Sequence, residues 1–328
     1  MTILTEFENN FHEVFQKAFP NIKITHDRYG DGLGLKYTQF LIPPQNKNLK
    51  GSNYYIDNKQ GYYHFTNLNA LQSIVSSGAI RLYNLNHLKD PREFQYAANL
   101  IPHGTDSLED AKENFFILSF CENISEFKLS EKFNIWRLYG ENGLGCIIKV
   151  KFVKNDLSNW NNFYLSKVYY GINDRHRINQ ISKALEGINK VNPNIGIDIG
   201  QVLCFHKSIL YRSENEVRLL YDYRRVKKGY GQLPFYDSDM NVIFPIIRTE
   251  ILRPFNPLVK YLELPIFHSG FSPIDDHIPI LAIGQIIIGF GWKNHFNEIK
   301  QELTLLFRKK MGFVPLITLS KLSKTFWG

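Results

Sequence analysis

From residue 61 onwards, short runs with the two-residue alternation of β-strands alternate with amphipathic runs of helical period. The run YYHFT at residues 62–66 leads into a helix-like segment at residues 67–77, which ends at Gly78, and a strand-like run follows at residues 79–83. No internal repeat and no low-complexity tract is found. The interleaving predicts an α+β fold, a mixed β-sheet core with flanking helices.

Further segments continue this pattern towards the end of the chain. The run at residues 214–223 alternates like a strand with one buried face, and the run at residues 283–292 resembles a central strand. The other expected strands lie at residues 113–123, 144–152 and 161–171, and the other expected helices open near Pro91 and at residues 131–143, 174–188, 198–212 and 294–312.

The first 60 residues stand apart from this pattern. Apolar side chains recur at helical spacing over residues 5–19, and Pro20 follows as a stop, so an amphipathic helix is expected there. A glycine-rich turn and a strand-like run come next, followed by a polar connector. We therefore expect an accessory helix-strand region at residues 1–60, which restricts a site or engages a protein partner, and a main domain at residues 61–328.

Composition limits the classes of protein that the chain can be. Its 328 residues, 44% of them hydrophobic, are enough for one large domain or two modest ones. The net charge of +8 is compatible with nucleic acid or a phosphate-rich cofactor as a ligand. The 3 cysteines are widely separated, no secretion signal is evident and no apolar stretch approaches the roughly 20 residues that span a bilayer. We expect a cytoplasmic protein without a membrane partner.

The common nucleotide and metal signatures are missing. The stretch GDGLG from Gly30 to Gly34 lacks the spacing and the strand-turn-helix context of a dinucleotide-binding loop, and no phosphate-binding GK[ST] motif occurs. CFH at residues 204–206 is isolated, so core packing explains it better than metal binding. A Rossmann fold or a phosphate-loop fold is therefore not expected, and no metal site is predicted.

Polar side chains do occur in or beside apolar elements, in three segments: YHFT, WRLYG and SENEVR. His64 and Thr66 are two residues apart, so they project to the same face of the expected strand. Each segment also has a simpler explanation. His64 could be a hydrogen-bonded core histidine, Trp136 and Tyr139 could pack at helical spacing, and the charges at residues 214–218 could form a row on a solvated strand face.

The order of these segments resembles a bacterial family described as domain of unknown function 2971. That family has an aromatic strand with His or Lys and Thr, a helix ending in IL.SG.LR, an NDP.E turn, a CFSE strand, a MW..YA...G helix and a strand ending E.EWR. The counterparts here are YYHFT, IVSSGAIR, LKDPREF, LSFCEN, IWRLYGENGLG and SENEVRLL. Lys89 replaces the asparagine of the turn, Arg92 stands before Glu93, and residues 1–60 have no counterpart.

YYHFTNLNALQSIVSSGAI also resembles, more distantly, the opening of DarT-type DNA ADP-ribosyltransferases and the HGT strand of poly(ADP-ribose) polymerases. This second resemblance implies an ADP-ribosyltransferase-like fold, NAD as substrate and a His, Tyr and Glu set across one cleft. His64, Tyr139 and Glu216 stand in the matching order. We expect them to line one cleft together with Thr66, with the strands of YYHFT and ENEVR in the same mixed sheet. A position of Glu216 on the opposite side of the sheet from His64 would contradict the transferase hypothesis.

The chemistry of NAD cleavage suits these residue types. A carboxylate such as Glu216 stabilises the oxocarbenium character that develops at the ribose when nicotinamide leaves. His64 and Thr66 could hold ribose hydroxyls, and a tyrosine ring gives nicotinamide a surface on which to stack. The expected cofactor-binding residues are His64, Thr66, Arg81, Tyr83, Trp136, Arg137 and Arg218, of which the arginines could meet the pyrophosphate.

The leading hypothesis is therefore an NAD-using ADP-ribosyltransferase-like enzyme, which transfers ADP-ribose to a macromolecule or hydrolyses NAD, as a toxin or phage-defence effector. A non-catalytic nucleic-acid-binding or regulatory module is the first alternative, because basic and aromatic residues alternate over residues 221–231. A metal-dependent nuclease that uses Asp90, Glu93 and Glu216 is the second.

Overall fold

The structure is a computed structural model of the chain. It describes residues 3–18, 23–28, 36–41, 56, 61–87, 111–122, 129–153, 160, 162–170, 180, 182–187, 190, 196–198, 200–224, 235–236, 242–244, 247–250, 259–267 and 278–323. Among the helices in these ranges, none is both long enough and apolar enough to cross a bilayer.

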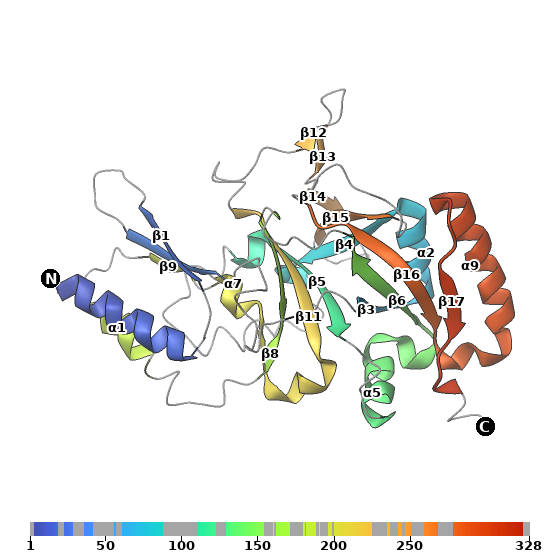
Figure 1. The fold of residues 1–328 in the computed structure, drawn as a ribbon, viewed down its shortest axis with the longest axis horizontal. Helices are drawn as coiled ribbons and strands as arrows, with labels where there is room; N and C mark the ends of the chain where they lie inside the picture. Colours follow the sequence, from blue (N-terminus) through green and yellow to red (C-terminus); the bar gives the residue numbers. More distant parts are fainter. Residues whose placement is uncertain are drawn as a thin grey trace.

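Helices and strands are mixed along the whole described chain (Figure 1). The helices that the structure describes from end to end are α1 (Ile3–Ala18), α2 (Leu68–Ser77), α5 (Leu129–Tyr139), α7 (Gly200–Leu203) and α9 (Phe296–Met311), with short 3-10 helices η2 (Leu85–His87), η5 (Glu141–Gly143), η7 (Ile209–Glu214) and η8 (Phe290–His295). The strands up to residue 207 are β1 (Lys23–Arg28), β2 (Lys36–Leu41), β3 (Tyr62–Thr66), β4 (Ala79–Asn84), β5 (Phe115–Glu122), β6 (Cys146–Phe152), β7 (Phe163–Lys167), β8 (Tyr169–Tyr170), β9 (Gly196–Asp198) and β10 (His206–Lys207). The remaining strands are β11 (Glu216–Asp222), β12 (Phe235–Tyr236), β13 (Val242–Phe244), β14 (Ile247–Glu250), β15 (Val259–Phe267), β16 (Leu281–Ile288) and β17 (Leu316–Leu319).

A 10-stranded sheet forms the centre of the molecule, and six of its strands pair in a closed ring. Around this ring β4 pairs with β15, β15 with β16, β16 with β6, β6 with β3, β3 with β5, and β5 again with β4. β11 and β7 continue the sheet from the other edge of β5. The pairs β15–β16 and β16–β17 are parallel and the other pairs of this sheet are antiparallel, so the predicted α+β class with a mixed sheet is confirmed.

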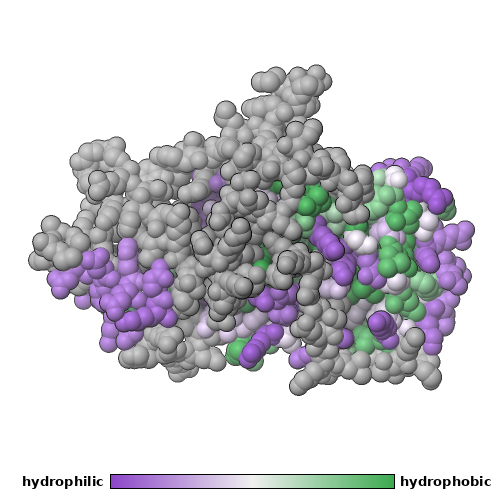
Figure 2. Space-filling model, in the orientation of Figure 1, coloured by the Kyte–Doolittle hydropathy of each residue, from purple (hydrophilic) through white to green (hydrophobic). Residues whose placement is uncertain are grey.

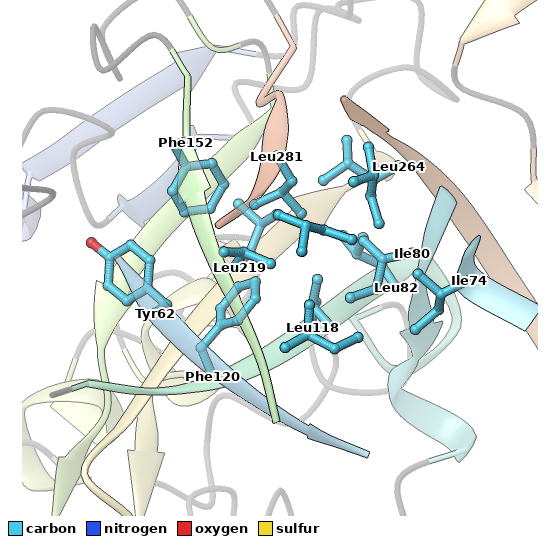
Figure 3. Packing of buried hydrophobic residues seen from close by; sticks show 14 of the residues in the cluster. Tyr62, Ile74, Ile80, Leu82, Leu118, Phe120, Phe152, Leu219, Leu264 and Leu281 are labelled. Atoms are coloured by element: carbon cyan, nitrogen blue, oxygen red, sulfur yellow. The ribbon is translucent and has the colours of Figure 1, made fainter. Parts of the chain in front are cut away.

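The main core lies against one face of these strands, and Figure 3 shows part of it. The rings of Tyr62, Phe120 and Phe152 lie together, with centroids 5.7 to 6.2 Å apart. Aliphatic side chains from β4, β5, β11, β15 and β16 fill the space beside them. Alternate residues of each strand supply these side chains, because a strand sends successive side chains to opposite faces.

Local signals set the helices that flank the sheet. Asn67 caps α2, since its side chain accepts a hydrogen bond from the backbone N–H of Ala70 at 2.6 Å. Gly78 ends α2 and Gly312 ends α9, each in the left-handed conformation that glycine adopts without strain. Hydrophobic surface lies among hydrophilic atoms on the right of Figure 2, where Figure 1 places α2 and α9. On α9, Leu305 is 57% exposed.

The N-terminal segment forms α1 and a three-stranded sheet with the order β1-β2-β9. The helix expected at residues 5–19 and the strand expected after the glycine-rich turn are both present, while β1 was not expected. β2 pairs in parallel with β9, so the first 60 residues contact the chain again near residue 197. Figure 1 shows α1, β1 and β9 at the opposite end of the molecule from α9 and β17.

Two sequence-based expectations are wrong in detail. The helix expected over residues 198–212 is divided into α7, β10 and η7, because His206 and Lys207 pair in parallel with β8 and are buried. The strand at residues 214–223 was expected to have one solvated face, but all seven residues of β11 are buried. Its charged residues Glu216 and Arg218 form an ion pair with each other. Because buried charges are tolerated when they are paired, this contact explains how both side chains are buried there.

Candidate functional site

Strand register divides the expected site residues between two faces of the sheet. Tyr63 pairs with Cys121, and Cys121 pairs with Glu216; directly paired residues share a face. His64 follows Tyr63 and faces the other side, where its ring meets that of Phe120 at a centroid distance of 6.1 Å. β3 and β11 do lie in one mixed sheet, as expected. The expectation that His64 and Glu216 line one cleft is wrong, because their side chains leave the sheet on opposite faces.

His64 and Thr66 do share a face of β3, as their spacing predicts. With its proton on Nδ1, His64 donates a hydrogen bond to the backbone carbonyl of Ser119 at 3.0 Å. The backbone pairing between β3 and β5 covers only Tyr62 and Tyr63 of β3. The side-chain bond of His64 therefore links the two strands just beyond the last paired residue. His64 therefore matches the simpler interpretation of a hydrogen-bonded histidine between strands.

Arg81 and Tyr83 lie on β4 and contact β15. The guanidinium of Arg81 lies 4.0 Å from the ring centroid of Tyr261, and its Nε is 3.7 Å from Oε1 of Glu263. The ring of Tyr83 is 6.3 Å from that of Tyr261. These two expected cofactor-binding residues therefore both contact Tyr261, and Arg81 also lies close to Glu263.

Trp136 and Arg137 are neighbours on α5 with different surroundings. Trp136 is buried and contacts the rings of Phe65 and Phe290, at centroid distances of 5.3 and 6.1 Å. This contact matches the interpretation of helix packing. Arg137 is exposed on the surface of α5.

Five side chains from four elements meet beside the start of β11. We call them the β11 polar cluster: Tyr139, Lys207, Glu214, Glu216 and Arg218. Lys207, Glu214, Glu216 and Arg218 are all 5% exposed or less, and Tyr139 at the end of α5 is half-buried. Of the expected catalytic residues, the structure thus brings Tyr139 and Glu216 into one cluster and leaves out His64.

Glu216 is held by two cations. Its Oε1 accepts a hydrogen bond from Nε of Arg218 at 2.6 Å, and its Oε2 accepts from the same guanidinium at 3.1 Å. Lys207 Nζ lies 2.8 Å from Oε2 as well. Arg218 also donates to the backbone carbonyl of Cys204 at 2.6 Å. The guanidinium is therefore engaged with Glu216 and the Cys204 carbonyl, and the pyrophosphate contact expected for it stays a prediction.

Glu214 joins the cluster through its other neighbours. Its Oε2 accepts a hydrogen bond from Lys207 Nζ at 2.6 Å, and its Oε1 accepts one from the hydroxyl of Tyr139. The helix segment WRLYG and the strand segment SENEVR therefore meet, and the direct partner of Tyr139 is Glu214, with Glu216 beyond it. Glu214 and Lys207 are the members that the sequence did not predict as site residues.

Asn215 allows both carboxylates to reach Lys207. It lies between η7 and β11 with a φ of 43°, in the left-handed region that asparagine tolerates better than most residues. Its backbone carbonyl accepts a hydrogen bond from the N–H of Glu122 at 3.0 Å, which ties the turn to β5. In the sequence E-N-E, the left-handed conformation of Asn215 thus changes the direction of the chain between the end of η7 and the start of β11.

Burial and charge shift the pKa values in opposite directions. Burial alone would raise the pKa of Glu216, but Arg218 and Lys207 lower it to about 2. Burial raises the pKa of Glu214 above its usual value, although Lys207 and Tyr139 act against this. Burial also lowers the pKa of the neighbouring His206 to about 4, so His206 is neutral at pH 7. The cluster therefore contains one firmly ionised carboxylate beside one that binds a proton more readily.

Two alternatives rest on residues outside the described ranges. Asp90 and Glu93, expected ligands of a nuclease metal, lie there, as does most of the basic segment at residues 221–231. In the part of the chain that the structure describes, no group of three or more His, Cys, Asp or Glu side chains is placed to hold a metal ion.

Comparison of the chain with protein-family models, with curated protein sequences and with solved structures finds no match to any of them. The family resemblances of YYHFT, WRLYG and SENEVR thus stay predictions from those motifs.

Proposed function

We propose that the chain is an NAD-using enzyme of the ADP-ribosyltransferase type, in which the β11 polar cluster supplies the reacting carboxylates. The observation that carries the proposal is the hydrogen bond from Tyr139 to Glu214, two residues before Glu216. It joins two segments that were selected from the sequence for this chemistry and that are 75 residues apart in the chain. The opposite faces of His64 and Glu216 contradict the transferase hypothesis in the form that the resemblance implies, with a His, Tyr and Glu set in one cleft. The present proposal rests on Tyr139, Glu214 and Glu216 alone, with His64 as a part of the strand framework that makes no contact with substrate.

The reaction needs a negative charge that stays in place. When the bond between ribose C1′ and the nicotinamide nitrogen breaks, its electron pair leaves with nicotinamide, and positive charge develops on the ribose. A fixed carboxylate stabilises that charge without having to reorganise. Glu216 is ionised for this role because Arg218 and Lys207 lower its pKa, and the same two cations offset part of its negative charge. An acceptor O–H or N–H, or water, then bonds to C1′ and gives its proton to a carboxylate.

The direction of access also supports the proposal. Tyr139 is the half-buried member of the cluster, while the four charged members are buried. Substrate would therefore approach from the Tyr139 side, where an aromatic ring can stack on nicotinamide. By analogy, we further propose that the enzyme acts in the cytoplasm as a toxin or phage-defence effector on a macromolecular acceptor.

The test is NAD turnover by the purified full chain, with Glu216→Gln as the key variant. Loss of the negative charge should lower turnover by roughly 10²-fold, while NAD binding persists. Glu122→Gln is the matched control, because Glu122 lies on the neighbouring strand and its partner Lys167 is 2.6 Å away, outside the cluster. This control should retain nearly full turnover.

Removing a buried charge can also unfold a protein, so a second variant accompanies the first. Tyr139→Phe removes one hydroxyl from a half-buried side chain, and it should lower turnover while the melting temperature changes little. The proposal is refuted if the wild-type chain neither consumes NAD nor transfers labelled ADP-ribose to protein, DNA or RNA. Equal turnover by wild type and a folded Glu216→Gln variant would also refute it.

A further inference from the structure

The two carboxylates of the β11 polar cluster receive different numbers of hydrogen bonds from charged donors. Glu216 receives two from the guanidinium of Arg218 and lies 2.8 Å from Lys207 Nζ. Glu214 accepts one hydrogen bond from Lys207, and its other oxygen accepts a hydrogen bond from the neutral hydroxyl of Tyr139. Charge-assisted bonds stabilise the ionised form more strongly than neutral ones. The first proton that enters the cluster should therefore bind to Glu214.

Lys207 is the link between these carboxylates, and its position is closely constrained. The side chain is 3% exposed, and Nζ lies 2.6 Å from Glu214 and 2.8 Å from Glu216. Nζ also lies 5.2 Å from the ring centroid of Tyr211. The backbone of Lys207 pairs with Tyr170 of β8, which holds the lysine over the start of β11.

The cluster is balanced in charge when all four ionisable side chains are ionised, with two cations and two carboxylates. Three further titratable groups of the described residues lie near it and are neutral at pH 7: His206 on β10 because its pKa is lowered to about 4, and Tyr170 and Cys121 because burial raises the pKa of each. Without Lys207, Arg218 would remain as the cluster's cation, and its donors point at Glu216. Glu214 would then be a buried carboxylate without a cation in the cluster, a state that favours protonation.

We propose that Lys207 is a positioning residue, which holds Glu214 and Glu216 together and keeps Glu214 ionised and ready to accept a proton, while Arg218 keeps Glu216 ionised. Glu214, with Tyr139 as its contact on the substrate side, is then the carboxylate that exchanges a proton. The reaction step that this serves rests on the proposed function. The proton from the acceptor O–H or N–H binds to the Glu214 carboxylate as the acceptor bonds to C1′, and it is later released to water. Glu216 stays ionised throughout, and no oxidant or reductant takes part.

The opposite pKa shifts of the two side chains agree with this division. Burial raises the pKa of Glu214, whereas Arg218 and Lys207 overcome burial at Glu216. Pairs of ionisable groups whose surroundings separate their pKa values are a general means of assigning an acid-base role to one and a fixed charge to the other.

The experiment is a carbon-13 NMR titration of the glutamate side-chain carboxyls in the full chain without NAD. Glu214→Gln and Glu216→Gln assign the two signals. We expect the Glu214 signal to titrate at a higher pH than that of Glu216. Lys207→Met should move the Glu214 titration upwards by more than about one pH unit, and Lys207→Arg should restore most of this shift, because it returns a cation.

Tyr139→Phe provides a second test if Lys207→Met does not fold. It removes a donor to Glu214 from a half-buried position, so it should raise the Glu214 titration and leave that of Glu216 unchanged. The proposal is overturned if Glu216 takes up its proton before Glu214, or if the folded variants leave the Glu214 titration where it was. These readouts need no substrate, so a chain with the expected titrations but no NAD turnover would refute the proposed function alone.

When the wild-type chain does turn over NAD, the pH profile adds a readout that a purely structural lysine would not change. Lys207→Met should shift the limb of the profile that depends on Glu214 towards higher pH, by the same amount as in the NMR titration. Lys207→Arg should keep the wild-type limb. If Lys207→Met lowers NAD turnover at every pH but leaves the pH of this limb unchanged, the positioning role is contradicted.

Discussion

At the scale of single residues, the conformation of Asn215 determines where the two glutamates point. A φ of 43° at this position turns the chain between η7 and β11, and both flanking carboxylates reach Lys207 as a result. Residues with a branched Cβ strongly disfavour this conformation, whereas glycine adopts it freely.

Substitution of Asn215 should therefore affect stability according to the backbone. We expect Asn215→Gly to change the free energy of unfolding by less than about 1 kcal/mol, because glycine accepts a positive φ. Asn215→Val should lower it by roughly 1–2 kcal/mol or more. Urea unfolding of both variants measures this, and equal losses for Gly and Val would show that the side chain of Asn215 matters more than its φ.

At the scale of elements, β3 and β5 show how a polar residue can lie where the backbone pairing of two strands ends, without belonging to a reaction site. The ladder between them covers Tyr62 and Tyr63, and the next residue, His64, replaces a ladder bond with a side-chain bond to Ser119. The bond lies in an exposed place, where water can also donate to the Ser119 carbonyl, so its contribution to stability is small although it connects the two strands.

This role predicts which substitutions β3 can accept. In His64→Asn the side-chain amide can stand in for the Nδ1 donor, so we expect a small loss of stability. His64→Leu cannot donate and should cost up to about 1 kcal/mol, because water can reach the exposed carbonyl in its place. If His64 has no part in the reaction, folded His64→Asn should keep most of its NAD turnover. A turnover as low as that of Glu216→Gln, in protein that melts normally, would return His64 to the reaction site.

These elements also show how far sequence reasoning reaches. α2 was predicted correctly because its signals are local: the cap at Asn67 and the left-handed Gly78. The shared face of His64 and Thr66 followed from strand alternation. The face of Glu216 relative to His64 depends on two strand registers, which no local pattern encodes. Lys207 was missed because the apolar spacing of residues 198–212 is helical, while pairing with β8 gives the chain another course there.

At the scale of the whole molecule, buried ionisable groups couple the stability of the fold to pH. Glu216 has a pKa of about 2 in the folded chain against an ordinary value of 4.5, and His206 has about 4 against 6.5. Both values are lowered on folding, so each group contributes stability that is fully present above its ordinary pKa and lost as the pH falls through its folded pKa. Glu214 has the opposite sign: its raised pKa costs stability as the pH rises past its ordinary value.

Acid unfolding should therefore proceed in two overlapping ranges. We expect a first loss of unfolding free energy between about pH 6.5 and 4, from His206, and a second between about pH 4.5 and 2, from Glu216. Denaturant unfolding across pH 2–7 measures both. Glu216→Gln should flatten the lower range and leave the upper one in place. Unchanged steepness of the lower range in that variant would mean that other carboxyls cause the acid unfolding.

The closed ring of strands has a consequence for synthesis on the ribosome. β3 and β4 lie near the start of the ring's sequence, but β15 and β16, which must pair with β4 and β6 to complete it, span residues 259–288. Until those residues emerge, the apolar side chains of β3 to β6 have no full set of partners. Domains with such distant pairings fold slowly and expose apolar surface meanwhile. The nascent chain should thus depend on chaperones until its last quarter has been made.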